Sequence, residues 1–326
     1  MDRRTAGGVG LIMLSSLGYG SGSVLAAPIY ATGIDWLTLV TWRFLVGAVL
    51  AWGWVALSAE RRRAARRLRG RPLLVALALG ALFTGNAGTY YAGLETVPAA
   101  LAGVLVYTYP VVVALLSLRF ATRLPGRRPW VALVLAVAGS ALALGGIDVR
   151  SAPPVSGLVL VWASALIYSV WIILSARLSG ERQDRLGSDA PAAGSAGDAA
   201  VATAVMMSAT FGVYAVAGVV IGRPMDPRTV PAAAWPGLVG VGFVASFLAI
   251  QAFYAGARRI GAAKAALVST FEPPIIVALS FVFLRQTLAP IQLLGAALIL
   301  VAVIVAQTAP RPSGAPEPAT PFEAEV

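Results

Sequence analysis

Two residue types, cysteine and histidine, are missing from this chain of 326 residues. Without cysteine there are no disulfide bonds and no thiolate metal ligands. Without histidine the chain lacks the commonest general base and the commonest nitrogen ligand of metals. Hydrolytic triads and zinc sites are therefore poorly supported, and we expect no catalytic residue, no cofactor and no metal.

Charge is also scarce, because only 12% of the residues are charged whereas 58% are hydrophobic, and the mean hydropathy is +0.81. A soluble domain carries about 25% charged residues, so this chain has too few polar side chains to cover a globule. Runs such as "PWVALVLAVAGSALALGG" do not alternate apolar and polar residues, as the strands of a membrane barrel would. The composition therefore predicts an all-α membrane protein.

About 20 apolar residues are needed for a helix to cross the hydrocarbon core of a bilayer. Ten segments of the chain meet this requirement, which predicts ten transmembrane helices. These segments are 7–28, 36–58, 72–93, 98–120, 128–147, 155–177, 200–222, 235–256, 261–284 and 288–307.

The basic residues gather on one side of this predicted arrangement. The net charge is +11, and 20 of the 25 Lys and Arg residues fall at the termini or in loops that face the same side. The positive-inside rule then puts both termini in the cytoplasm, with the chain in the cell membrane. The richest run, "ERRRAARRLRGR" at 60–71, merely joins two predicted spans, so we expect it to meet anionic lipid headgroups and not nucleic acid.

Two segments are predicted to lie outside the membrane. Residues 180–200 form a cytoplasmic loop rich in Gly, Ser, Ala and Asp, and residues 309–326 form a Pro-rich, acidic tail that we expect to be disordered. The first apolar segment has a second interpretation, a cleaved signal peptide, because "MDRR" precedes it and "VLAAP" offers small residues.

An internal repeat relates the two halves of the chain. Residues 91–120 align with 254–283 without gaps at an offset of 163, with ten of 30 positions identical and Pro110 opposite Pro273. Each repeat would hold five spans, 1–150 and 151–308. Since five is odd, the halves must cross the membrane in opposite directions, and the solute site of such proteins usually lies near the midplane between them.

The paired repeats, "WRFLVGA" at 42–48 and "TFEPPIIVALS" at 270–280 resemble the EamA-type transporters of the drug/metabolite superfamily. The resemblance implies ten helices, an alternating-access cavity, and transport of amino acids or similar small metabolites. The chain departs from the family at "LRQTLAP" (284–290), where a Gly-Glu pair is common. The first repeat also reads "YTYP" (107–110) where the second has "TFEP".

Glu272 is the one acidic residue near the centre of a predicted span, and Pro273 and Pro274 follow it directly. Carboxylates at bilayer depth are costly and usually functional, so one interpretation is a proton- or solute-binding group that lines a cavity. The other is a structural hydrogen bond to backbone that the prolines leave unpaired. A polar cavity would solvate the carboxylate and the broken backbone together.

Arg43 lies about 12 Å of helix from the start of its predicted span at Trp36. It can bind a carboxylate or phosphate, or it can pair with a neighbouring helix for structural reasons. Further polar and aromatic side chains share faces with these groups and suit an organic solute, although helix packing explains each of them equally well. They are Ser23, Asn86, Tyr90, Tyr107, Tyr168, Trp171, Gln251 and Phe271, and the expected helix breaks are at Pro110, Pro273 and Pro274.

The sequence thus predicts a secondary transporter that exports a small metabolite by alternating access, with protons as the natural coupling ion. No Walker-type motif for ATP hydrolysis is present. Two other functions remain open at this point, a membrane scaffold or sensor that uses the 180–200 loop and the tail, and a lipid-handling membrane protein.

Overall fold

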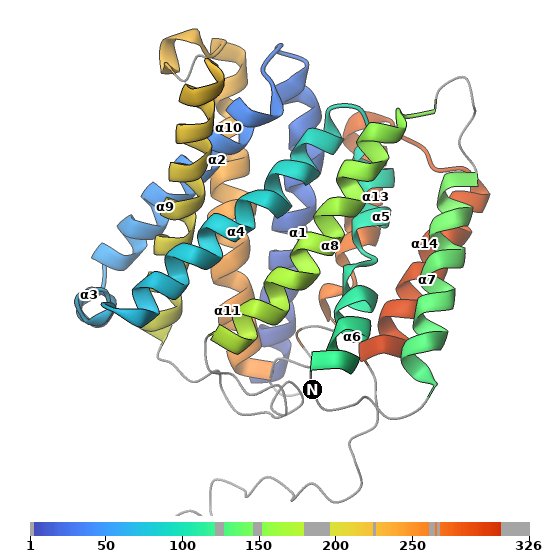
Figure 1. Cartoon of the computed structure of the whole chain (residues 1–326), viewed down its shortest axis with the longest axis horizontal. Helices are drawn as coiled ribbons and strands as arrows, with labels where there is room; N and C mark the ends of the chain where they lie inside the picture. The colour runs from blue at the N-terminus through green and yellow to red at the C-terminus, as the bar shows by residue number, and fades with distance from the viewer. Residues whose placement is uncertain are drawn as a thin grey trace, which may run out of the picture.

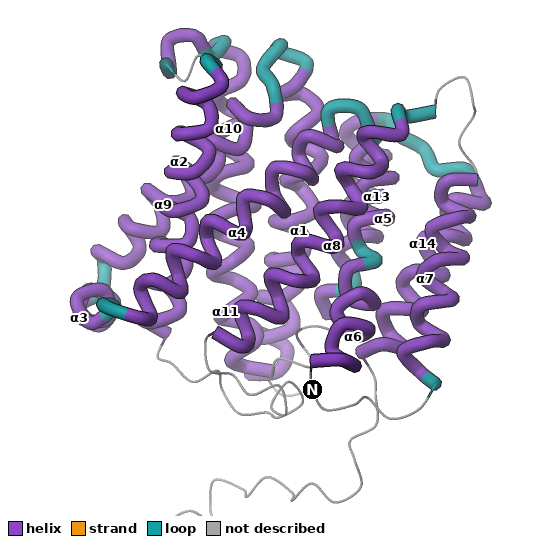
Figure 2. Tube along the Cα trace, viewed as in Figure 1, coloured by secondary structure: helices purple, strands orange, loops and turns teal. Residues whose placement is uncertain are grey.

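A computed structural model describes residues 3–120, 127–145, 152–178, 196–223, 226–260, 265 and 268–307. Every regular element in these ranges is a helix, and most of the helices run side by side between two edges of the molecule (Figures 1 and 2). The predicted tail 309–326 and most of the predicted loop lie outside the described residues. Residues 196–200, which we predicted to belong to that loop, form instead the first turn of a helix.

The elements are named in chain order. They are α1 (Arg3–Tyr30), α2 (Trp36–Ala56), α3 (Ala59–Arg67), α4 (Arg71–Leu94), α5 (Ala99–Val106), α6 (Tyr109–Phe120), α7 (Arg128–Gly145), α8 (Val155–Leu178), α9 (Ala196–Ile221), the short 3-10 turns η2 (Pro227–Thr229) and η3 (Ala232–Ala234), α10 (Trp235–Val241), the π-helical η4 (Gly242–Leu248), α11 (Ala249–Ile260), α13 (Glu272–Leu284) and α14 (Pro290–Gln307).

Among the described residues, six helices are long and apolar enough to cross a membrane, and they coincide with the first, second, third, sixth, seventh and eighth predicted spans. The other four predicted spans coincide with shorter apolar helices, Ala99–Val113, Trp130–Leu144, Glu272–Leu284 and Pro290–Val305. The chain is therefore a multi-helix assembly of apolar segments, as predicted. The count of ten crossings stays a prediction.

α1 lies at the centre of the bundle and packs against α11 and α13 (Figure 1). Its glycines allow this close approach. A Cβ atom added to Gly18 would lie 2.9 Å from the Ala249 Cβ of α11, and one added to Gly20 would lie 3.1 Å from the Ile276 Cγ1 of α13. Around this centre the helices form neighbouring pairs, α2 with α9, α4 with α8 and α7 with α14.

Local sequence explains where several helices begin. Asp35 caps α2, because its Oδ1 accepts the Thr38 N–H at 2.8 Å. Gly70 adopts a positive φ of 61° directly before α4, whose first turn holds a proline. Between these two helices, α3 buries Ala64 and exposes most of its arginines at one edge of the bundle.

Two helical segments are interrupted at equivalent positions. α5 ends at Val106 and α6 begins at Tyr109, whereas the turn at Thr270 and Phe271 precedes α13, which begins at Glu272. Tyr109 and Glu272 are 163 residues apart, which is the offset of the sequence repeat. Both half-helices therefore begin at the same point of the repeated pattern.

Candidate functional site

The helix interruptions lie immediately before the prolines and not at them. Pro110 is the second residue of α6, and Pro273 and Pro274 fall in the first turn of α13. In the first turn a missing backbone N–H costs no hydrogen bond, and the fixed φ of proline suits a helix start. The prolines therefore start new half-helices, and the turn before each one is where the backbone departs from the helix.

Glu272 is the first residue of α13, so its carboxylate lies at the helix end where the macrodipole favours negative charge. The part of the chain that the structure describes provides no hydrogen bond or ion pair to this side chain. Five tyrosines lie within range of its charge. They are Tyr19, Tyr90, Tyr107, Tyr109 and Tyr168.

At the interruption of the second repeat, a backbone carbonyl accepts a hydrogen bond from a side chain of the first repeat. The hydroxyl of Tyr107 donates to the Ser269 carbonyl oxygen. Pro273 has no N–H to donate to this carbonyl, four residues earlier in the chain. The carbonyl is therefore paired inside the protein, as a membrane interior requires.

Arg43 lies in the middle of α2 and is 8% exposed. Its Nε donates to the Ser246 hydroxyl at 2.7 Å, and its guanidinium carbon lies 4.7 Å from the centroid of the Tyr91 ring. Ser246 belongs to the π-helical segment η4, a type of irregularity that is frequent at functional sites. Within the described ranges no carboxylate pairs with Arg43, so a buried cation is held by neutral groups.

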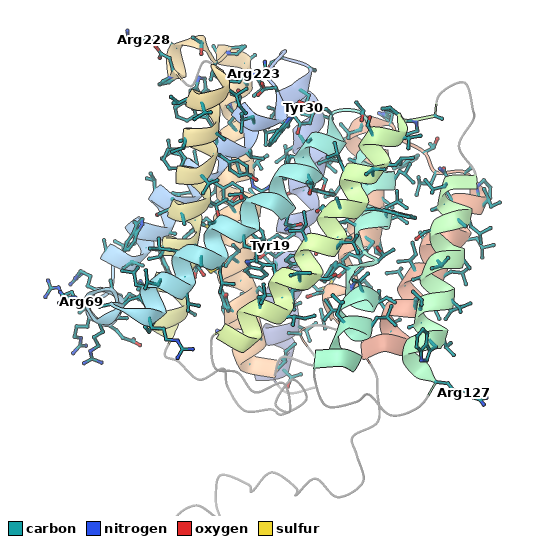
Figure 3. All side chains as sticks on the ribbon, viewed as in Figure 1. Tyr19, Tyr30, Arg69, Arg127, Arg223 and Arg228 are labelled. Carbon is teal, nitrogen blue, oxygen red and sulfur yellow. The ribbon has the colours of Figure 1, made fainter. Side chains whose placement is uncertain are left out.

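Two tyrosines lie near both charged groups. Tyr19 and Tyr90 are each within range of the charges of Arg43 and of Glu272. Figure 3 shows Tyr19 midway between the two edges of the bundle, and the Tyr90 hydroxyl forms a hydrogen bond with the Ser23 hydroxyl at 2.9 Å. A positive group, a negative group and two phenolic hydroxyls therefore occupy one region of the bundle.

An aromatic wall adjoins the carboxylate. The ring centroids of Tyr107 and Tyr109 lie 5.4 Å apart, those of Tyr109 and Tyr168 lie 4.8 Å apart, and Tyr168 stacks on Trp171 at 5.8 Å. Phe83 closes the wall with an edge contact to Trp171 at 5.4 Å. The wall presents apolar ring faces together with phenolic oxygens, which suits a solute that has polar and apolar parts.

Several predicted residues make structural contacts. Asn86 accepts the Ser164 hydroxyl at 2.7 Å, which ties α4 to α8, and the Trp171 indole N–H donates to the Leu79 carbonyl oxygen at 2.9 Å. Phe271 is 54% exposed on the outside of the bundle. Gln251 is different, because its buried Nε2 has no hydrogen-bond partner among the described residues, which leaves two donors available inside the protein.

The sequence prediction omitted two residues that belong to this centre, Tyr109 and Ser246. Tyr109 had a signal, because the repeat alignment sets it opposite Glu272. Ser246 had none, because its bond to Arg43 joins residues 203 positions apart. Within the described ranges no three His, Cys, Asp or Glu side chains gather in a way that could hold a metal ion.

Comparison with known proteins agrees with this architecture. A solved crystal structure superposes with a TM-score of 0.59 over 92% of this chain and 96% of that chain, at 19% sequence identity, so the likeness shows the fold alone. A search of curated proteins finds no match. The model of the EamA-like transporter family matches residues 6–145 and 190–308, which is most of the chain. The chain belongs to the EamA-like transporter family, whose members are multi-pass membrane transporters.

Proposed function

We propose that the protein is a secondary transporter that exports zwitterionic metabolites such as amino acids by alternating access. The observation that supports the proposal is that Tyr19 and Tyr90 each lie within range of the charges of both Arg43 and Glu272. One buried cation and one buried carboxylate in the same region, with hydroxyls near them, match the opposite charges of an amino acid backbone.

Each group has a defined role in this proposal. The guanidinium of Arg43 has five N–H donors and engages Ser246, the Tyr91 hydroxyl and two aromatic ring faces, so donors remain for a solute carboxylate. Glu272 accepts the solute ammonium group, and the wall around Tyr168 and Trp171 packs against the apolar part. The unpaired amide of Gln251 adds donors.

The two-repeat arrangement supports alternating access. The family model matches the chain over two segments, and α6 and α13 begin 163 residues apart. In Figure 1, α6 ends at the edge near the N-terminus whereas α13 ends at the opposite edge, as expected for inverted repeats 1–150 and 151–308. In such transporters the half-helices meet at the solute site and the repeats rock about it.

The orientation follows from the arginines. Arg69 and Arg127 lie at the same edge as the N-terminus, whereas Arg223 and Arg228 lie at the opposite edge (Figure 3). Since the N-terminal edge also carries the seven arginines of segment 60–71, we assign it to the cytoplasm of a cell whose inner membrane holds the protein.

Proton coupling is the second part of the proposal. A proton and a solute ammonium group compete for the same carboxylate, so the binding of one favours the release of the other. Exchange of the two at Glu272 would drive the solute against its gradient without any further cofactor.

The test is solute counterflow in proteoliposomes across a panel of amino acids, each compared with its decarboxylated amine and its deaminated acid. We expect amino acids to exchange faster than either analogue. In Glu272→Gln the remaining exchange should lose its dependence on pH. If folded protein exchanges no member of the panel, the transport proposal fails, and the scaffold or lipid-handling functions become the stronger explanations.

A further inference from the structure

A separate cavity of about 200 Å³ lies near the edge opposite the N-terminus. Its lining includes Ser23, Ala27, Glu95 and Gln286. Ala27 lies one turn before Tyr30, which Figure 3 shows at that edge. The cavity therefore reaches from the surface, where Glu95 is exposed, to Ser23, which is 3% exposed inside the bundle.

Ser23 connects this cavity with the central site. Its hydroxyl forms a hydrogen bond with the Tyr90 hydroxyl at 2.9 Å, and Tyr90 lies within range of the charges of Glu272 and Arg43. The hydrogen-bonded pair of Ser23 and Tyr90 thus joins the cavity lining to the region of these charged groups.

Glu95 contributes a negative charge to the lining of the cavity, and a hydrogen bond fixes its side chain. Its Oε1 accepts the Trp36 N–H at 2.6 Å, which joins the end of α4 to the start of α2. The charged groups that face it are Asp35 and Arg223, and these two pair with each other at 3.2 Å. Since Arg223 is engaged by Asp35, the net charge of the three groups is negative.

Gln286 forms the opposite wall. Its Oε1 accepts the Ala100 N–H at 3.3 Å, which ties the segment after α13 to the start of α5. The mouth is therefore framed by α1, the end of α4, the start of α5 and the segment after α13, which come from both halves of the chain. Motion between the halves would change its width.

We propose that this cavity is the outer mouth of the route to the central site, and that Glu95 admits solutes carrying an amine cation in preference to anions. The inference rests on the proposed function, because a mouth requires a route behind it. It deepens that function by naming a charge filter outside the binding site.

The absence of native cysteine permits a direct test with single-cysteine variants. Ala27→Cys places a thiol in the cavity, Ser23→Cys places one at its floor, and Thr229→Cys marks the exposed edge near Arg228. Each is treated, in intact cells and in inverted vesicles, with a cationic trimethylammonium or an anionic sulfonate methanethiosulfonate. The thiol gains a disulfide to the reagent, and methanesulfinate leaves.

We expect Ala27→Cys to react from the face at which Thr229→Cys reacts, and Ser23→Cys to react from that face more slowly. Adding Glu95→Gln to Ala27→Cys should lower the ratio of the cationic to the anionic rate about five-fold, which is equivalent to ~1 kcal/mol. Asp226→Asn removes one negative charge at the same edge but outside the cavity, so it should leave the ratio unchanged.

The inference is overturned if Ala27→Cys or Ser23→Cys reacts only from the other face or not at all. An equal effect of Glu95→Gln and Asp226→Asn, or no effect of either, also overturns the charge filter. None of these outcomes contradicts the proposed transport function, which the counterflow assay tests separately. Failed counterflow beside a Glu95-dependent rate ratio would instead refute transport, and with it the assignment of the cavity as a mouth, whereas the charge selectivity of the cavity would stand.

Discussion

The tight contact between α7 and α14 gives a quantitative prediction of stability. In Gly295→Ala the new Cβ would lie 2.6 Å from the Ala143 backbone nitrogen and 3.1 Å from the Ala143 Cα, and it would press on the Gly139 carbonyl oxygen. These are backbone atoms of a helix, so the two helices must separate to make room. Overpacking of this kind costs ~1–3 kcal/mol, more than the ~1 kcal/mol that alanine gains over glycine in a helix.

Gly212→Ala in α9 is the matched control, because nothing lies within 4 Å of the Cβ it would add. We expect it to raise the free energy of unfolding by ~0.5–1 kcal/mol. Gly295→Ala should lower the free energy of unfolding by up to ~2 kcal/mol, which is the overpacking cost less the gain in helix propensity. The assay is thermal unfolding of both purified variants in detergent, where 1 kcal/mol shifts Tm by about 2–4 °C in chains of 150–250 residues. Shifts of the same sign in both variants would refute the packing argument.

Three further predictions concern single side chains. Trp171→Phe removes the indole bond to the Leu79 carbonyl oxygen at 2.9 Å, so unfolding experiments should show a loss of ~1 kcal/mol, and no loss would mean that water replaces the bond. Asp35→Ala removes both the cap of α2 and the ion pair with Arg223, so it should lower the free energy of unfolding by ~1–2 kcal/mol. Asp35→Asn keeps a capping side chain and should lower it by less than ~1 kcal/mol. Equal losses in the two variants would contradict the capping role. Burial raises the pKa of Glu95, and the hydrogen bond from the Trp36 N–H partly offsets this rise. The carboxyl group of Glu95 therefore binds its proton more tightly in the folded state than in the unfolded state. Stability should fall as pH rises from the ordinary carboxyl range through the raised pKa. Glu95→Gln should remove that part of the pH dependence of Tm, and an unchanged pH profile would argue against it.

Composition and spacing located the long apolar helices but not α3, which lies in a run that we predicted to be a connecting loop. Low charge and long apolar runs predicted helices at all ten segments, because a bilayer demands about 20 apolar residues for each crossing. The combination of an acidic residue with two prolines also predicted an interruption beside Glu272. The structure starts α13 at that residue.

The contacts of the site could not be predicted, because they depend on how each helix is rotated about its axis. Arg43 donates to Ser246 and Asn86 accepts from Ser164, across gaps of 203 and 78 residues. A sequence shows that such side chains need a partner at membrane depth, but several polar residues on other helices compete for that role. The π-helical turn that presents Ser246 has no distinctive residue pattern.

The mouth of the cavity was missed for another reason. Glu95 and Gln286 lie at helix ends, where polar residues are common and carry no signal by themselves. Their contacts with Trp36 and Ala100 become visible only once the ends of α2, α4, α5 and α13 are brought together.

The division of roles between Arg43 and Glu272 is the central claim, and counterflow with two variants tests it most directly. Arg43→Gln should lose the preference for an amino acid over its decarboxylated amine, whereas Glu272→Gln should lose the preference for the amino acid over its deaminated acid. Ser246→Ala, which removes a hydrogen-bond partner of Arg43 but keeps the cation, should retain both preferences. If Arg43→Gln and Glu272→Gln alter the two preferences equally, or alter neither, the two charges do not bind the two ends of a solute.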